Sequence, residues 1–150
     1  MKTYDPNLPG IAAQGDLNIM VLPKGYTIDK SDEIKAAKGR ITLVEGEATG
    51  HSHSIHGLMT GFKPAQIKQG TAHLYRDTAL TTKLVRDGHL LREDPIIGFL
   101  TVEDAPIIVH HADEQGNETG EHESWRLPIN EYVIWRQQEG DEEDRRMVND

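Results

Sequence analysis

The chain has 150 residues, with 16 Lys and Arg against 25 Asp and Glu, and it contains no cysteine. Its formal net charge of -9 argues against a nucleic-acid partner, because phosphate backbones would be repelled. The lack of cysteine excludes disulfides, thiol catalysis and cysteine-based zinc sites, so any metal must be bound by His, Asp or Glu. This length fits one domain with a hydrophobic core of its own.

Residues 1–16 contain four proline and glycine residues and little periodicity, so we expect an arm that is either disordered or docked on another part of the structure or on a neighbour. They lack the basic and apolar regions of a signal peptide. No apolar run in the chain approaches the roughly 20 residues that span a bilayer. We therefore expect a protein that is made in the cytoplasm and has no membrane partner.

The next segments predict a strand, a helix and a second strand. An apolar run over 17–22 ends at a proline and predicts the first strand. Ser31, two acids, two lysines and Gly39 follow one another in the order of an N-cap, an acidic first turn, a basic last turn and a C′ glycine, which predicts a short helix over 31–39. Alternating apolar residues over 40–48 predict the second strand.

The Asp87-Gly88 dipeptide is the strongest turn signal in the middle of the chain. It supplies the positive φ angles of a two-residue type I′ turn, which predicts a β-hairpin formed by 80–86 and 89–92. Residues 57–70 predict a long loop or a strand broken by a bulge, and residues 113–120 predict a surface loop, because both segments are interrupted by glycine. Apolar and β-branched runs predict further strands at 72–76, 97–102, 107–111, 124–129 and 131–137.

The last residues are strongly charged, with five acids in 139–144 followed by two arginines, and predict a tail that cannot be buried. We expect an N-terminal arm over 1–16, a β-domain over 17–138 that stays folded without either end, and a C-terminal tail over 139–150. About eight or nine short strands with one helix predict an all-β fold, a small single-domain sandwich or barrel of which a jelly roll is one form.

The stretch 45–56, Glu-Gly-Glu-Ala-Thr-Gly-His-Ser-His-Ser-Ile-His, holds three of the eight histidines. If the strand that precedes it continues, His51 and His53 lie on the same face. Two imidazoles at this spacing can bind one metal ion, because their nitrogen atoms project in the same direction.

A second group of histidines, at 110, 111 and 122, can meet the first in a β-fold. His110 and His111 point to opposite faces of a regular strand, so at most one of them joins the site, and the apolar pattern leaves both open. Three or four imidazoles suit zinc or another divalent transition metal. The candidate ligands are therefore His51, His53, His111 and His122. The alternative is a hydrogen-bonded polar surface strand that binds no metal.

Several acids offer carboxylates near these histidines. Glu45 and Glu47 are candidate acid-base groups, and Glu121 and Glu123 flank His122, where either can supply an oxygen ligand. No nucleophile elbow or Ser-His-Asp order is visible, so the sequence favours a protein that is not an enzyme. Three aromatic residues at the C-terminal end are predicted to be core residues, namely Trp125, Tyr132 and Trp135.

The Gly-Glu-Ala-Thr-Gly-His-x-His box over 46–53, the later His122 and the ending over 132–137 resemble a family of small uncharacterised proteins from phage, prophage and bacterial genomes. This resemblance implies a structural protein of the virion, such as a capsid decoration or cement protein. Such a protein would be a homo-oligomer, made in the cytoplasm and attached through its two ends to the capsid.

More distantly, His-x-His after a glycine resembles the first half of the cupin motif. Cupins are jelly-roll barrels that bind a metal through three histidines and a glutamate. The second cupin motif, with its Pro-x-Gly and histidine, is absent from this chain. This resemblance implies the alternative function, a metal-binding protein or metalloenzyme that uses the histidine cluster.

Overall fold

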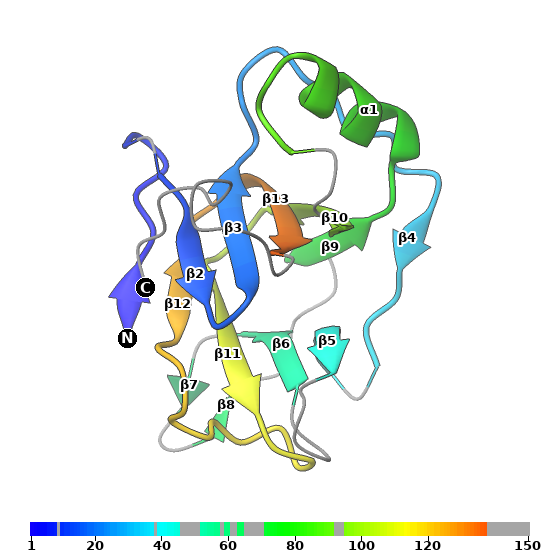
Figure 1. The fold of residues 1–150 in the computed structure, drawn as a ribbon. Coiled ribbons are helices and arrows are strands. Elements are labelled where there is room, and N and C mark those ends of the chain that lie inside the picture. Colours follow the sequence, from blue (N-terminus) through cyan, green and yellow to red (C-terminus); the bar gives the residue numbers. More distant parts are fainter. Residues whose placement is uncertain are drawn as a thin grey trace.

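The computed structural model describes residues 1–8, 10–37, 39–45, 52–57, 59–60, 63–64, 71–91 and 95–137. Within these residues the chain forms two open sheets that face each other across a hydrophobic core (Figure 1). The predicted all-β single-domain sandwich is therefore confirmed, and the two sheets do not close into a barrel. The predicted tail over 139–150 lies outside the described residues.

The first sheet has five strands and the second has six. The first contains, in spatial order, β1 (Lys2–Thr3), β12 (Trp125–Leu127), β11 (Ile107–Ala112), β6 (Ser52–His56) and β5 (Ile41–Glu45). The second contains β2 (Ala12–Gln14), β3 (Leu17–Val21), β13 (Asn130–Arg136), β10 (Ile96–Val102), β9 (Ala72–Tyr75) and β4 (Glu33–Ile34). A separate pair consists of β7 (Met59–Thr60) and β8 (Lys63–Pro64).

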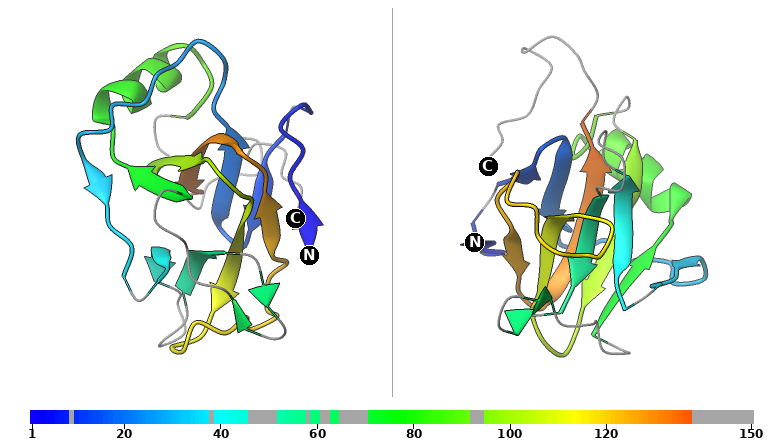
Figure 2. Two further views of the ribbon diagram at one scale, coloured as in Figure 1. Left: turned by 180° about the vertical axis from the view of Figure 1, so that it is seen from behind. Right: turned by 90° about the horizontal axis from the view of Figure 1, so that it is seen from below.

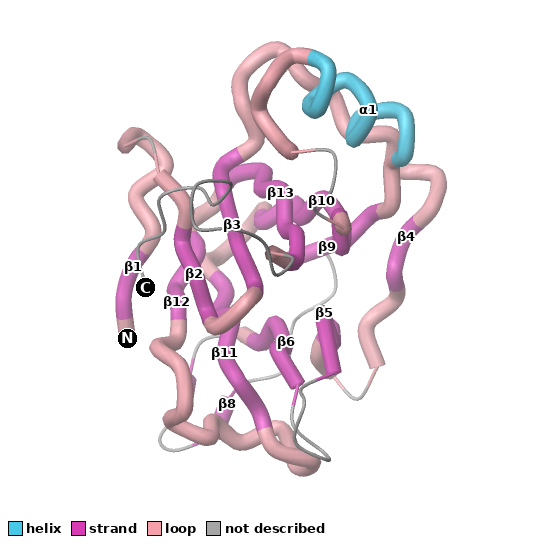
Figure 3. Tube along the Cα trace, in the orientation of Figure 1, coloured by secondary structure: helices cyan, strands magenta, loops and turns pink. Residues whose placement is uncertain are grey.

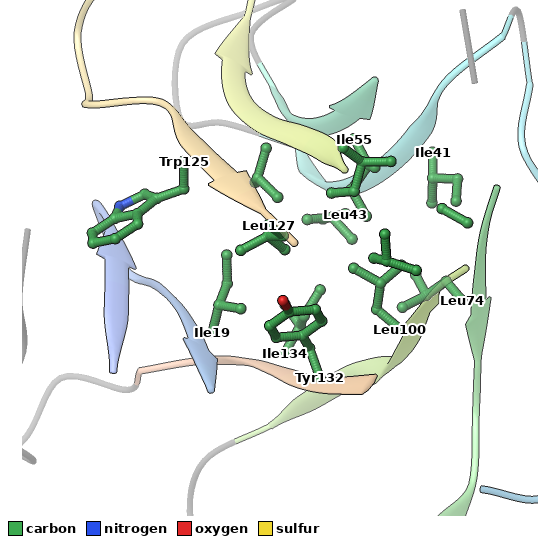
Figure 4. Close-up of a cluster of buried hydrophobic side chains, with 14 of the residues drawn as sticks. Ile19, Ile41, Leu43, Ile55, Leu74, Leu100, Trp125, Leu127, Tyr132 and Ile134 are labelled. Carbon is green, nitrogen blue, oxygen red and sulfur yellow. The ribbon is translucent and has the colours of Figure 1, made fainter. Parts of the chain in front are cut away.

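The six-stranded sheet is buried on both faces, as β13 illustrates. Tyr132 and Ile134 point into the core between the sheets (Figure 4), whereas Val133 and Trp135 belong to a second apolar cluster on the opposite face. Because both faces are covered, this strand is apolar at successive positions instead of alternating with polar residues. The predicted burial of the C-terminal aromatic residues is confirmed, since Trp125, Tyr132 and Trp135 are all core residues.

A helix covers this second cluster. Helix α1 (Thr78–Arg86) is the one helix among the described residues (Figure 3), and it lies on the side of the six-stranded sheet that faces away from the five-stranded sheet (Figure 2). No helix in the described ranges is long and apolar enough to cross a membrane. Leu80 and Leu84 of α1, one turn apart, are buried against the sheet.

The predicted hairpin around Asp87-Gly88 is wrong, because the preceding residues form α1. Asp77 is the N-cap, and its side chain accepts a hydrogen bond from the backbone N–H of Leu80 at 3.0 Å. Asp87 is the C-cap, and Gly88 follows it with a φ of 83°. A glycine with positive φ ends a helix as readily as it forms a hairpin turn, and the capping pattern decides between them here.

The predicted helix over 31–39 is also wrong. Glu33 and Ile34 form β4, which pairs with β9 at the edge of the six-stranded sheet. Ile34 is partly buried and packs against the core between the sheets. The segment carries one large apolar residue, too few for the apolar stripe of a helix, so its capping signals do not produce one.

The N-terminal segment is part of the β-domain, so the prediction of a separate arm is wrong. Strand β1 pairs in parallel with β12, and β2 pairs antiparallel with β3. Tyr4 is 5% exposed and lies in the core between the sheets. Its hydroxyl donates to the carbonyl oxygen of Gly10 at 2.9 Å and accepts from the N–H of Val21 at 3.0 Å. The few apolar residues of this segment thus complete the edges of both sheets.

The burial of Tyr4 generates a stability prediction. Tyr4→Ala should lower the free energy of unfolding by about 3 to 5 kcal/mol, because it leaves a cavity between the sheets. Tyr4→Phe keeps the ring and should cost about 1 to 2 kcal/mol, for the two hydrogen bonds lost. Urea unfolding measures both. If Tyr4→Ala were as stable as the parent chain, the N-terminal segment would not be packed on the domain.

Candidate metal centre

The inner face of the five-stranded sheet changes from apolar to histidine at one end. Along β11, Ile107 and Val109 face the core, and His111 is the next residue on that face. Along β6, Ile55 faces the core, and the register pairs His53 directly with His111. Both imidazoles are buried. The alternation that forms the core therefore also places two histidines at the end of the sandwich.

The loop after β11 brings a third histidine to this pair. Thr119 donates its backbone N–H to the carbonyl oxygen of His111 at 3.0 Å, so the chain folds back along the end of the strand. The ring centroid of His122 lies 5.1 Å from that of His111 and 6.0 Å from that of His53. The centroids of His53 and His111 are 5.2 Å apart.

Glu121 adds a carboxylate to the cluster. One ligand atom from each of His111, Glu121 and His122 lies within 4.8 Å of the other two. The carboxylate Oε2 of Glu121 is 3.7 Å from Nδ1 of His111, and its side chain is 54% exposed. His111 is buried and Glu121 reaches solvent, so the group has a fixed inner side and an open outer side.

The turn between β2 and β3 forms one wall of the cluster. Gly15 has a φ of 62°, and a Cβ atom at this position would lie 3.1 Å from Nε2 of His122. The imidazole therefore packs directly on the glycine, where a larger residue would have a strained backbone and a tight contact. Asp16 follows, with Oδ1 3.9 Å from Nε2 of His53, and its other carboxylate oxygen pairs with Arg136.

Gln14, in the same segment, is fully buried and reaches across the sandwich. Its Nε2 donates to the carbonyl oxygen of Val109 at 3.0 Å and to that of Glu123 at 2.9 Å. Its Oε1 lies 2.8 Å from Nδ1 of His53. The pKa of His53 is lowered to about 4, first because the ring is removed from water and then by the nearby His111, while Asp16 opposes the shift. His53 is therefore neutral at neutral pH.

His110 belongs to a different pair on the outer face of the same two strands. Its ring centroid is 4.0 Å from that of His56, and both rings are buried. Among the described residues, both ring nitrogens of His110 and Nε2 of His56 have no hydrogen-bond partner. Burial is the main cause that lowers the pKa of His56 to about 3 and that of His110 to about 4, and Arg40 lowers both further. Of the two adjacent histidines, it is thus His111 that joins the cluster.

Three of the four ligands predicted from the sequence, His53, His111 and His122, lie together in the structure. His51 lies outside the described residues, as does Glu47, and the side chain of Glu45 is not described. Glu123 instead pairs with the N-terminal ammonium group of Met1 at 2.8 Å. Whether the cluster binds a metal stays a prediction.

The sequence pattern did not predict that Gln14, Gly15 and Asp16 belong to the site, because it placed residues 1–16 in an arm. A glycine between two polar residues, followed directly by the apolar run from Leu17, is typical of a hairpin turn and could have indicated the β2–β3 connection. Nothing in the sequence pairs Gln14 with a histidine 39 positions later.

Residues 13–137 match the model of the family described as "Domain of unknown function (DUF8820)". No curated protein and no solved structure matches the chain.

The buried pair of His56 and His110 generates a prediction about pH. Their folded-state pKa values lie below the unfolded value of about 6.5, so the unfolded chain binds more protons and stability falls as the pH falls from about 6.5 towards about 4. At about pH 5 the burial of each imidazole should lower the free energy of unfolding by about 2 kcal/mol relative to about pH 7. Urea unfolding with a chelator present should show this loss, and His56→Asn should reduce it. A stability that is the same at about pH 7 and about pH 5 would contradict the burial of these rings.

Proposed function

Because this chain belongs to the DUF8820 family, whose description gives no function, we propose a function from the geometry: the domain binds a divalent transition-metal ion through His111, Glu121 and His122. One observation carries the proposal. The three side chains offer ligand atoms within 4.8 Å of one another at the end of the sandwich. Bonds of about 2.0 to 2.2 Å from nitrogen and oxygen to a zinc ion need only small side-chain adjustments to close this group around it.

The kinds of ligand indicate which ions suit the site. Two imidazoles and one carboxylate are typical of catalytic zinc sites and of non-haem iron(II) sites. Calcium and magnesium prefer oxygen ligands, so they fit this group less well. Three protein ligands leave at least one coordination position for water or another ligand, which the exposed side of Glu121 would leave accessible.

The surroundings of the group support cation binding. His111 pairs with His53 of β6, and its carbonyl oxygen accepts a hydrogen bond from the backbone N–H of Thr119, so this ligand is held in place before an ion binds. The carboxylate of Asp16, which also pairs with Arg136, lies beside His53, and the carboxylate of Glu121 lies at the opening. A cation in this position would lie near two carboxylates in a chain whose formal net charge is -9.

A structural role in a phage virion, attachment to a capsid and a homo-oligomeric state stay predictions, and so does a cupin-like enzyme. A bound ion is compatible with a structural or a catalytic use.

Titration of the purified, metal-free protein with Zn²⁺ or Co²⁺ tests the proposal. We expect one ion to bind per chain at neutral pH. Calorimetry measures the binding of Zn²⁺, and visible absorption measures that of Co²⁺. His111→Asn, His122→Asn and Glu121→Gln should each weaken binding by more than the roughly 10- to 100-fold that loss of an outer-shell partner costs. His89→Asn is the matched control, because His89 is an exposed histidine just after α1 whose ring contacts Tyr26, and it contacts none of the three candidate ligands among the contacts described.

Binding should also weaken between about pH 7 and about pH 5, because imidazole ligands must be deprotonated. In the same range a chelator should lower the melting temperature of the metal-loaded protein at about pH 7 and have little effect at about pH 5. Failure to bind either ion at neutral pH, or an equal loss in the His89→Asn control, would refute the proposed site.

A further inference from the structure

The ring of His53 lies beside those of both candidate histidine ligands, with centroids 5.2 Å from His111 and 6.0 Å from His122, yet it lies outside the compact group formed by His111, Glu121 and His122. Its role therefore depends on which of its two ring nitrogens carries the proton. Neutral imidazole donates from one nitrogen and accepts at the other, and the hydrogen bond made by one nitrogen fixes the state of the other.

Gln14 determines this proton position, because its own orientation is fixed. Its amide nitrogen lies within hydrogen-bond distance of two backbone carbonyl oxygens, those of Val109 and Glu123, and only an NH₂ group can donate to both. The amide oxygen must then be the atom that faces His53, at 2.8 Å from Nδ1. An amide oxygen only accepts hydrogen bonds, so Nδ1 of His53 carries the proton and Nε2 carries a lone pair.

The Nε2 lone pair of His53 lies near another hydrogen-bond acceptor. Nε2 is 3.9 Å from Oδ1 of Asp16, which is also an acceptor. Two acceptors that face each other favour a hydrogen-bond donor or a cation between them. His53 is 4% exposed whereas the Asp16 side chain is 40% exposed, so this gap lies where the interior meets solvent.

We propose that Gln14 is a positioning residue of the metal centre, which holds His53 in the Nδ1–H tautomer so that Nε2 accepts a hydrogen bond from a water molecule bound to the metal ion. The inference rests on the proposed function for the water and the ion, but the tautomer exists in the metal-free protein as well. Outer-shell partners of this kind orient the groups around a metal ion and usually change its affinity by about 10- to 100-fold.

Two substitutions of Gln14 separate positioning from packing. Gln14→Glu loses at least one of the two donations to Val109 and Glu123 and Gln14→Met loses both, but only Gln14→Glu keeps an oxygen that can accept from His53. A merely structural role predicts equal effects of the two substitutions. A positioning role predicts that Gln14→Glu retains the Nδ1–H tautomer and that Gln14→Met populates both tautomers.

Nitrogen-15 NMR of the histidine side chains in the metal-free protein measures the tautomer. We expect wild-type His53 to be protonated at Nδ1. Protonation at Nε2, or the same mixture of tautomers in Gln14→Glu and Gln14→Met, would overturn the positioning role. The wild-type measurement decides the first point even if Gln14→Met does not fold, which thermal unfolding checks.

The metal-loaded protein tests the water-mediated contact. With ¹¹³Cd²⁺ as the probe, we expect cadmium–nitrogen coupling at His111 and His122 and none at His53. Coupling at His53 would make it a direct ligand and overturn this part of the proposal. His53→Asn keeps a donor for Gln14 but has no acceptor in the place of Nε2, so it should weaken Zn²⁺ binding by about 10- to 100-fold.

The two proposals fail in different ways. Absence of Zn²⁺ and Cd²⁺ binding in the wild-type chain would refute the metal site and leave the tautomer result standing. Normal metal binding with unchanged affinity in His53→Asn would retain the metal site and refute the role of His53.

Discussion

The hydrogen bonds of the buried Gln14 amide join the two sheets at the end where the core becomes polar. From β2 in one sheet, the side chain reaches the carbonyl oxygen of Val109 and the ring of His53 in the other. It also bonds to the carbonyl oxygen of Glu123, in the segment that carries the candidate ligands. The free energy cost of burying an unpaired amide is roughly 2 to 7 kcal/mol in an apolar environment, so these partners largely determine how the sheets meet here.

The N-terminal segment matters to the site for the same reason. Gln14, Gly15 and Asp16 each contact a histidine of the cluster, and the N-terminus itself pairs with Glu123. Tyr4 holds the open end of the β2–β3 hairpin, because its hydroxyl bonds to Gly10, which precedes β2, and to Val21, the last residue of β3. The core packing of Tyr4 and the wall of the site are thus connected through one short stretch of chain.

The sequence predicts most of the fold because the β-strands follow simple rules. Runs such as 107–111 and 131–137 are too apolar and too β-branched to be anything other than buried strands. The errors fall where two rules compete. Asp87-Gly88 suits a hairpin turn and a helix end equally. Asp77 is a suitable N-cap, but the sequence does not show that Leu80 and Leu84 have a sheet face to cover.

The sequence predicts only part of the candidate site, because some of its residues share a strand and others are brought together by strand pairing and a turn. Histidines at alternating positions in a strand share a face, so the pattern could relate His53 to a metal but could not choose between His110 and His111. That choice depends on the register of β11 against β6, which only the paired strands determine. The contacts of Gln14 and Asp16 depend on a turn that brings one sheet to the other, and no periodicity in the sequence records them.

The histidines occupy positions where a sandwich would be more stable with apolar residues. His53 and His111 continue the inner-face rows of Ile55 and Val109. Removal of the His53 ring from water is the main cause that lowers its pKa to about 4. The buried ring of His53 has Gln14 as its hydrogen-bond partner, and Gln14 in turn donates to two carbonyl oxygens. Several polar groups are therefore buried together to support rings that packing does not require. Such a network is expensive unless it is fully satisfied, and a cation between the imidazoles and carboxylates would complete it.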